Sequence, residues 1–305
     1  MLTGLIAEVK KNKVLFLMAV PAVALVLVFA YIPMAGMVLA FKNYRFNLGI
    51  FGSPWNGLEN FRFFFISGTG LLVTKNTIFF NLLNLATSQT IALAIAIIIT
   101  EIRGKYFKKI TQSVIFLPYF ISWVIVGVFI YNIFNFESGT MNTVLKSLNL
   151  APVNVYGMPS IWILIINAFN SWKWAGYISV LYIAAITNID PECFEAADID
   201  GANIFQKITN ITIPSIMPTI MILFLLSIGR ILRGDFQMFY QIVGNNGQLF
   251  NTTDVIDTFV FRSLVSSGDM AMPAAATFYQ SVLCFATIMI VNGIIKKTRP
   301  ENALF

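Results

Sequence analysis

Long apolar stretches constrain this sequence more than any other feature does. A helix needs about 20 apolar residues to cross a bilayer, and six stretches reach that length, although the fourth contains Lys173 and the fifth contains Arg230. The six predicted spans cover about 14–41, 76–100, 110–136, 159–187, 214–233 and 270–295. We therefore predict an all-α membrane protein with six transmembrane helices in a single transmembrane domain, residues 1–305.

The composition agrees with this prediction. Charged residues make up only 11% of the chain, whereas soluble domains carry about 25%. The first apolar run follows three lysines, as in a signal peptide, but its 28 uncharged residues are too many for one. No cleavage site of small residues closes the run, so we expect a retained anchor.

The basic residues predict the orientation of the chain. An even number of spans places both termini on one side, and positive charge gathers beside span ends on the cytoplasmic side. Eleven basic residues lie on the side that we assign as cytoplasmic: Lys10, Lys11, Lys13, Arg103, Lys105, Lys108, Lys109, Lys207, Lys296, Lys297 and Arg299. We predict an N-in, C-in topology. The same bias explains the formal charge of +6 without a nucleic-acid partner.

Several kinds of chemistry lack the residues that they need. The sequence has no histidine, which excludes histidine acid–base catalysis and histidine metal sites. Cys193 and Cys284 are far apart, and we expect both to be buried apolar side chains. No nucleophile–base pair or metal-ligand cluster is evident. The sequence therefore predicts no catalytic residue, no metal site and no enzyme.

The segments between the spans carry their own expectations. Outside the membrane, we expect residues 42–75 to lie along the interface, residues 137–158 to form a loop, and residues 234–269 to contain a short helix after Asp254 that dips partly into the membrane. Polar residues within the second span need hydrogen-bond partners, which we expect on a second subunit: Asn81, Asn84, Ser88 and Gln89.

The loop between the fourth and fifth spans, residues 188–213, is predicted to be cytoplasmic and unusually structured. Asp190-Pro191-Glu192 is typical of a helix start, because Asp caps free N–H groups and Pro fits the first turn. We expect this helix to break near Gly201. A second short helix follows, with its apolar residues on one face, and Pro214 ends it.

Two interpretations of this loop stay open on pattern alone. It is longer than most helix–helix connections, and its acidic edge and apolar face would form a protruding knob. The first interpretation is a surface loop packed on neighbouring helices. The second is a docking element for a cytoplasmic partner, with Glu195 available to pair with an Arg or Lys.

The loop also resembles a known family. Glu195-Ala196-Ala197, then Gly201, Ile211 and Ile213-Pro214 resemble the EAA loop of binding-protein-dependent ABC importer permeases, with Ile213 replacing the usual Leu. The stretches "LPYFISWVIVGVFIYNIF" and "DVIDTFVFRSL" are similar to six-span sugar-type permeases, especially those that import complex oligosaccharides and polysaccharide fragments.

This resemblance implies a type I ABC importer permease fold in a bacterial plasma membrane. It implies a second, usually different, permease subunit, an ABC ATPase dimer that hydrolyses ATP with Mg²⁺, and an extracytoplasmic solute-binding protein that delivers an oligosaccharide. This chain would bind no cofactor itself, because its only Gly-Lys pair, Gly104-Lys105, lacks the flanking residues of a phosphate-binding loop. The residues implied in coupling to the ATPase are Glu195, Ala196, Ala197, Asp200, Gly201, Ile211 and Pro214.

The substrate path is implied by resemblance to the maltose-type permeases. Seven residues fall where substrate-facing positions lie: Lys173, Trp174, Tyr177, Ser227, Arg230, Ile231 and Gly234. Aromatic faces and polar groups inside spans suit a sugar, and two cations would suit an acidic one. The alternatives are that the polar residues hold helices together, that the tryptophans anchor at the interface and that Lys173 snorkels.

Other functions are less consistent with the sequence. A secondary transporter is expected to carry an internal repeat and a buried carboxylate, but every Asp and Glu here lies in a loop or at a span end. A membrane scaffold or assembly protein would not need the acidic, glycine-broken loop. We therefore predict a permease subunit.

Overall fold

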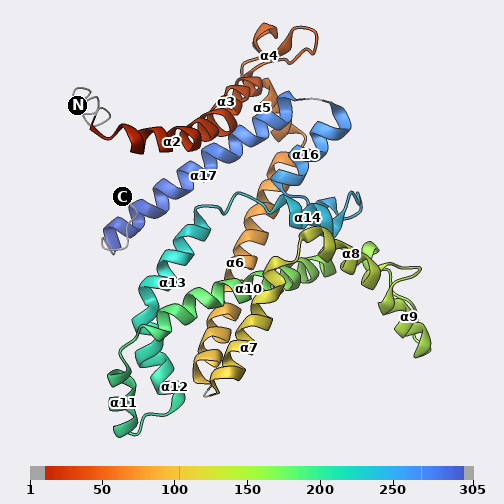
Figure 1. Cartoon of the computed structure of the whole chain (residues 1–305). Helices are drawn as coiled ribbons and strands as arrows, with labels where there is room; N and C mark the ends of the chain where they lie inside the picture. The colour runs from red at the N-terminus through yellow and green to blue at the C-terminus, as the bar shows by residue number, and fades with distance from the viewer. Residues whose placement is uncertain (1–10, 103, 269, 299–305) are drawn as a thin grey trace. The chain divides into compact units, whose positions relative to one another are not determined.

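The computed structural model describes residues 11–102, 104–268 and 270–298, and this part of the chain folds almost entirely into helices. The first half contains α2 (Lys13–Val26), α3 (Ile32–Met34), α4 (Gly49–Gly52), α5 (Glu59–Ile66), α6 (Thr69–Glu101), α7 (Lys105–Phe116), α8 (Trp123–Phe134) and α9 (Thr140–Ser147) (Figure 1). The second half contains α10 (Pro159–Thr187), α11 (Pro191–Ile199), α12 (Ile204–Lys207), α13 (Ile213–Ile228), α14 (Phe236–Val243), α15 (Phe250–Thr253), α16 (Ile256–Ser267) and α17 (Ala271–Thr298). The all-α fold is confirmed.

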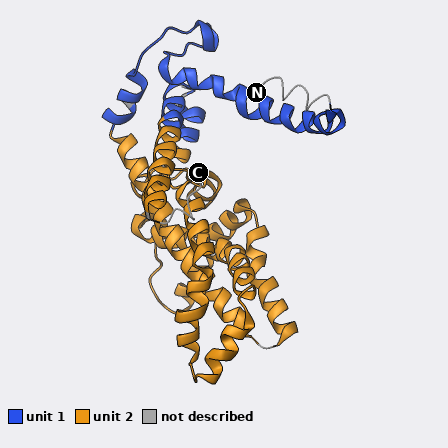
Figure 2. Ribbon diagram, turned by 90° about the vertical axis from the view of Figure 1, so that its left-hand side faces the viewer, with its two compact units in different colours: residues 1–67, 260–278 blue, residues 68–259, 279–305 orange. Residues whose placement is uncertain are grey.

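The chain divides into two compact units, which Figure 2 shows in different colours. Unit 1 comprises Met1–Ser67 and Val260–Phe278, and unit 2 comprises Gly68–Phe259 and Tyr279–Phe305. Within unit 1, the amide of Asn60 donates to the backbone oxygens of Ala40 and Lys42, both at 2.9 Å. These bonds hold α5 against the end of the first long helix. The candidate sites below all lie within unit 2.

By length and composition, fewer helices can cross a membrane than the six that we predicted. Four helices in the described residues are long and apolar enough: Lys13–Phe41, Thr69–Glu101, Ile204–Ile228 and Ala271–Lys297. A bent pair, Lys105–Phe120 with Trp123–Phe134, adds a fifth if it is counted as one span. Helix α10 has 29 residues, but its central asparagines, serine and Lys173 lower its mean hydropathy. The count of six and the sidedness therefore stay predictions.

The predicted span 110–136 is not one straight helix. Helix α7 runs into a 3-10 turn, Leu117–Phe120, and the chain then bends by 91° into α8. Pro118 favours this break because it cannot donate to the helix ladder. Ser122 then begins a new helix, since its hydroxyl accepts from the Ile125 N–H at 3.4 Å.

The expected end of a short helix at Pro214 is wrong. Helix α12 passes through a π-helical turn, Ile208–Thr212, directly into α13, so one helix runs from Ile204 to Ile228. A proline inside a helix collides with the carbonyl of the preceding turn, and a wider π turn just before Pro214 gives that carbonyl room. The helix ends at Ile228, so Arg230, Ile231 and Gly234 lie in the turn after it.

The core of unit 2 is built around α10. One cluster joins α6, α10 and α13 through alanines and larger residues: Ala92, Ala96, Ile99, Ala175, Tyr182, Ile183, Ile186 and Ile216. Gly176 lets α7 approach closely, because a Cβ there would lie 2.0 Å from the Ile115 oxygen. A second cluster joins α6, α8, α10 and α14, where Trp162, Phe80 and Phe239 are fully buried.

The segment 234–269 contains more structure than we predicted. The helix expected after Asp254 is α16, which begins at Ile256. We did not predict α14, which Asp235 caps by accepting from the Met238 N–H at 3.1 Å. Helix α14 packs against α8 through its buried residues, Met238, Phe239, Ile242 and Val243. Residues 137–158 likewise contain the short helix α9.

Candidate functional site

A ladder of polar side chains joins α6 to α10. The Asn167 amide donates to Asn84 Oδ1 at 3.0 Å and to Thr87 Oγ1 at 2.9 Å. Farther along both helices, the Asn170 amide donates to Ser88 Oγ at 3.1 Å, and the ladder ends where the Tyr182 hydroxyl donates to Gln89 at 2.5 Å. Residue numbers rise together along the ladder, so the two helices run parallel.

This ladder corrects the expectation that the polar residues of α6 need a second subunit. Asn84, Ser88 and Gln89 find their partners on α10. Asn81 donates to the backbone oxygens of Ile231 at 2.7 Å and Arg233 at 3.2 Å. Hydrogen bonds between membrane helices satisfy groups that have no water to bind. The polar residues of α6 therefore stabilise the fold of this chain without a second subunit.

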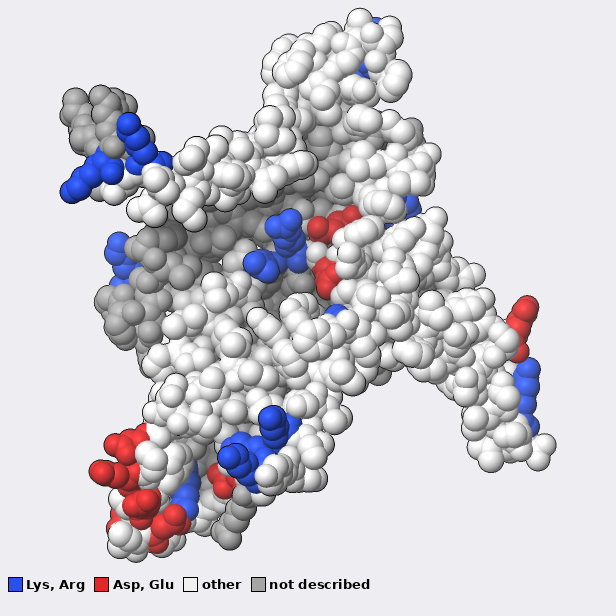
Figure 3. Space-filling view, in the orientation of Figure 1, with Lys and Arg blue, Asp and Glu red and all other residues white. Residues whose placement is uncertain are grey.

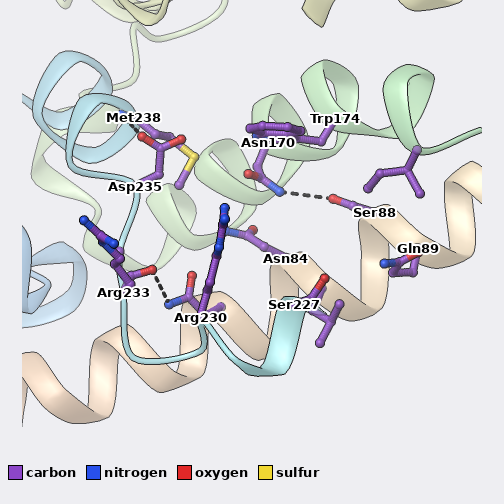
Figure 4. Close-up of a pocket in the computed structure, with 14 residues that line it drawn as sticks. Asn84, Ser88, Gln89, Asn170, Trp174, Ser227, Arg230, Arg233, Asp235 and Met238 are labelled. Atoms are coloured by element: carbon purple, nitrogen blue, oxygen red, sulfur yellow. Dashed lines mark hydrogen bonds between the residues drawn. The ribbon is translucent and has the colours of Figure 1, made fainter. Parts of the chain in front are cut away.

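The ladder forms one wall of a cavity of about 380 Å³. Its lining comes from α6, α10, the end of α13 and the start of α14 (Figure 4). The lining residues are Asn81, Asn84, Leu85, Ser88, Gln89, Asn170, Trp174, Ile178, Ser227, Arg230, Arg233, Gly234, Asp235 and Met238. Amides, hydroxyls, one indole and three charged groups thus surround one space, which we call the polar cavity.

The charges in the polar cavity are unbalanced. Arg230 and Arg233 are both exposed, and neither forms an ion pair with any residue that the structure describes. Asp235 is the one carboxylate in the lining, and its two oxygens are occupied by the Met238 N–H and by the indole N–H of Trp123. The two guanidinium groups are therefore available for an anion, which arginine binds in a planar, bidentate geometry.

Hydrogen bonds with Asp257 and Gln280 hold the turn that carries the two arginines. Asp257 of α16 accepts from the Gly234 N–H at 2.7 Å and from the Gln280 amide at 3.0 Å. Gln280 also donates to the Leu232 oxygen at 2.7 Å. Burial raises the pKa of the Asp257 carboxyl, and the two donors oppose this rise. Asp257 and Gln280 thus hold the backbone on which Arg230 and Arg233 are presented.

The structure brings together four of the seven residues predicted for the substrate path. Trp174, Ser227, Arg230 and Gly234 line the polar cavity. The other three do not line it: Lys173, Tyr177 and Ile231. The Tyr177 ring stacks on Tyr119 with 4.6 Å between centroids, and the Ile231 backbone oxygen accepts from Asn81.

Lys173 has a structural environment that the sequence did not reveal. It is 7% exposed, and its ammonium group donates to the backbone oxygens of Tyr119 at 3.0 Å and of Ile121. The oxygen of Pro118 lies 3.4 Å away. These oxygens belong to the break between α7 and α8, where the helix ladder is interrupted. Lys173 therefore satisfies the break and does not snorkel.

Sequence reasoning did not single out Arg233 as a cavity residue, and it named Asp235 only as a polar residue after the fifth span. Their signal was present in the short stretch "RILRGD", where two arginines three positions apart are followed by Gly and Asp. We expected the span to continue to about residue 233, which would have placed these residues at its outer end. The structure instead ends α13 at Ile228 and folds the stretch back over the cavity.

The loop between α10 and α13 forms a knob, residues 190–213, which begins and turns where its local signals predicted. Asp190 caps α11 by accepting from the Glu192 N–H at 3.0 Å, and Gly201 turns the chain with φ +74°. Asn203 and Gln206 form a reciprocal capping box at the start of α12. An ion pair between Lys207 and Asp198 joins the two helices.

Most of the knob surface is exposed in the part of the chain that the structure describes. Glu195, Ala196, Asp200, Gly201 and Pro214 are exposed, while Ala197 and Ile211 are partly buried. Acidic side chains gather over α11 at the lower left of Figure 3. Two large apolar side chains stand beside them, Ile199 at 88% exposure and Phe205 at 76%. Cys193, expected to be buried, is also exposed, because it lies on the outer side of α11.

The chain matches known proteins along nearly its whole length. Residues 92–299 match the family described as "Binding-protein-dependent transport system inner membrane component". The polygalacturonan/rhamnogalacturonan transport system permease protein YteP of Bacillus subtilis (strain 168) is 31% identical, over 98% of this chain and 92% of the relative. Protein LplB of the same organism is 30% identical, over 97% of this chain and 92% of the relative.

Solved structures agree with these matches. A chain in the crystal structure of a bacterial ABC transporter involved in the import of the acidic polysaccharide alginate superposes with a TM-score of 0.86. It is 30% identical, and the match covers 97% of this chain and 99% of that one. A chain of the alginate transporter in complex with its alginate pentasaccharide-bound periplasmic protein gives a TM-score of 0.84 at 30% identity, over 96% of this chain and 97% of that one. The chain therefore belongs to the family of binding-protein-dependent transport system inner membrane components, and it is an ABC transporter permease subunit, a transport component and not an enzyme.

Proposed function

We propose that this chain forms half of the translocation path of an ATP-driven importer for acidic oligosaccharides. The observation that carries the proposal is the polar cavity, in which Arg230 and Arg233 have no ion-pair partner among the described residues. A uronate carboxylate is the sugar group that such guanidinium groups bind best. The names of the similar proteins support an acidic substrate, since they include polygalacturonan and alginate.

The rest of the cavity suits the uncharged part of a sugar. Trp174 offers an aromatic face, and Asn84, Gln89 and Ser227 offer donors and acceptors for hydroxyl groups. A cavity of about 380 Å³ falls within the range of small-molecule sites, roughly 300 to 1,000 Å³. This volume fits one or two sugar rings, so a longer oligosaccharide would pass through it in steps.

The knob is proposed to couple this chain to an ABC ATPase dimer, which would hydrolyse ATP with Mg²⁺. Its exposed acidic and apolar side chains fit docking better than packing on neighbouring helices. Glu195 would pair with a basic residue of the ATPase, and Ala196, Ala197, Asp200, Gly201, Ile211 and Pro214 would shape the contact. The helix from Ile204 to Ile228 is continuous, so a movement of the knob would reach the end of α13, next to Arg230.

We also propose six spans with both termini in the cytoplasm of a bacterial cell. The parallel arrangement of α6 and α10 requires a crossing between them in the opposite direction, which the bent pair α7 and α8 supplies. Helix α10, with 29 residues, is about 43 Å long, enough to cross. In Figure 1 the end of α6, the start of α7 and the knob lie at the same end of unit 2, together with Lys105, Lys108 and Lys109, as cytoplasmic basic residues would.

Three further partners complete the proposal: a second and different permease subunit, an extracytoplasmic solute-binding protein and the surrounding lipid. The test is uptake by the whole complex in proteoliposomes, with alginate and polygalacturonate oligosaccharides compared with neutral maltooligosaccharides. We expect Arg230→Gln with Arg233→Gln to lower uptake of the acidic probes at least tenfold, because each charge-assisted bond contributes about 1.5–3 kcal/mol. Equal uptake of a neutral glycan by wild type and variant, with none of the acidic probes, would refute the acidic substrate.

A further inference from the structure

The break between α7 and α8 is linked to the polar cavity by a chain of three side chains. The break leaves backbone oxygens without helix partners, and the buried ammonium group of Lys173 donates to those of Tyr119 and Ile121. A membrane protein must satisfy such groups internally. Lys173 therefore stabilises the break at which α8 begins.

The first residue of α8, Trp123, links the break to a residue of the polar cavity. Trp123 is 5% exposed, and the Lys173 ammonium lies 5.2 Å from the centre of its ring, a distance at which a cation is attracted to an aromatic face. The same indole donates its N–H to Asp235 Oδ2 at 3.0 Å. Lys173 thus acts on Asp235 through Trp123, although Lys173 does not line the cavity itself.

Both oxygens of Asp235 are held by donors other than the two arginines of the cavity. One oxygen accepts from Trp123 and the other from the Met238 N–H at 3.1 Å. Arg230 and Arg233 line the same cavity (Figure 4), yet no ion pair joins either one to Asp235 in the described residues. A carboxylate that loses the Trp123 donor can turn about its side-chain bonds and pair with a guanidinium group of the same cavity.

We propose that Lys173 and Trp123 are positioning residues that keep the Asp235 carboxylate away from Arg230 and Arg233, so that both arginines stay free for an anionic substrate. This proposal rests on the proposed function, because it assigns the two arginines to substrate. It assigns the break between α7 and α8 a role in selecting an anionic substrate. It also explains how a cavity for acidic sugars can contain a carboxylate.

The decisive experiment is a rescue. In proteoliposomes containing the whole importer, KM and maximal rate are measured with alginate pentasaccharide as the acidic probe. Trp123→Phe keeps the ring and removes the N–H, and we expect it to raise KM about tenfold, the effect of one lost bond to a charged group. Adding Asp235→Asn removes the competing charge, and we expect KM to return to within about twofold of wild type.

Lys173 is tested in the same assay. We expect Lys173→Met to raise KM as Trp123→Phe does, and Lys173→Arg, which keeps a buried cation, to restore it in part. Asp235→Asn should rescue Lys173→Met as well. If Asp235→Asn leaves the KM of either variant raised, Lys173 and Trp123 support the fold only and the proposal is overturned.

A measurement without substrate separates this proposal from the proposed function. In the purified importer labelled with ¹⁵N, Asp235→Asn and Lys173→Met should shift the Trp123 indole N–H resonance, which Trp123→Phe identifies by its disappearance. Trp123→Phe should also shift the guanidinium resonances of Arg230 and Arg233, and Asp235→Asn should reverse that shift. If wild type transports no acidic probe but these shifts occur, the proposed substrate is wrong and the positioning stands. Unchanged guanidinium resonances would overturn the positioning.

Discussion

The knob and the polar cavity depend on different kinds of sequence signal. Every feature that shapes the knob comes from residues close in sequence, such as the Asp190 cap, the positive φ of Gly201 and the Asn203–Gln206 capping box. The cavity joins residues more than 80 positions apart, as in the bond between Asn167 and Asn84. The difference teaches that the shape of the knob can be predicted from local signals, whereas the lining of the cavity depends on how distant helices meet.

The largest effect is expected from substitutions that remove the local signals of the knob. Gly201→Pro cannot keep φ +74°, because the proline ring fixes φ near −65°. Together with Glu195→Arg, it should remove the ATPase from the purified complex and lower uptake at least a hundredfold, while the second permease stays bound. Mass spectrometry of the tagged complex checks this.

Glu137→Arg is the matched control for that prediction, since it reverses an exposed acidic residue in the loop between α8 and α9. It should keep the ATPase bound. If the double variant also keeps its ATPase, the knob is a packed surface loop and docking must be sought elsewhere.

A second prediction concerns Gly176, where a substitution has opposite effects on helix propensity and on the packing of α10 against α7. Gly176→Ala improves helix propensity by about 1 kcal/mol, but its Cβ would lie 2.0 Å from the Ile115 oxygen. Overpacking of this kind costs about 1–3 kcal/mol, and we expect a net loss because the opposing atom is backbone. Thermal unfolding in detergent measures it. A stabilised variant would show that α7 and α10 do not approach as closely as the structure places them.

The sequence predicted more of the fold than of the cavity for the same reason. Hydropathy located α6 and α17 because each contains a long uncharged apolar run. Resemblance to the maltose-type permeases placed Trp174 on the substrate path, together with Arg230, which interrupts the fifth apolar run. Lys173 interrupts a run too, but only the bend at Ile121 shows that its partners are backbone oxygens. No local pattern predicts that contact, nor the return of Arg233 and Asp235 over the cavity.

A third prediction concerns the polar ladder. Asn167→Ala removes two hydrogen bonds to α6, and bonds between membrane helices contribute about 0.6 kcal/mol on average, with a maximum near 1.7. We expect a loss of about 1–2 kcal/mol in the purified single chain. Asn84→Ala should add little on top of Asn167→Ala, because the two side chains share one bond. Full additivity, or an effect only in the complete complex, would mean that these residues face a second subunit.

The smallest effect is expected at the ion pair inside the knob. Asp198 is 64% exposed and Lys207 is 22% exposed, so solvent screens their attraction and the pair contributes less than about 1 kcal/mol. Lys207→Gln should leave the unfolding temperature nearly unchanged and weaken ATPase binding only a few-fold. A loss of ATPase binding as large as that of Gly201→Pro would show that the knob depends on the contact between Asp198 and Lys207, which are nine residues apart in the sequence. The shape of the knob would then depend less on neighbouring residues than the cap, the glycine turn and the capping box indicate.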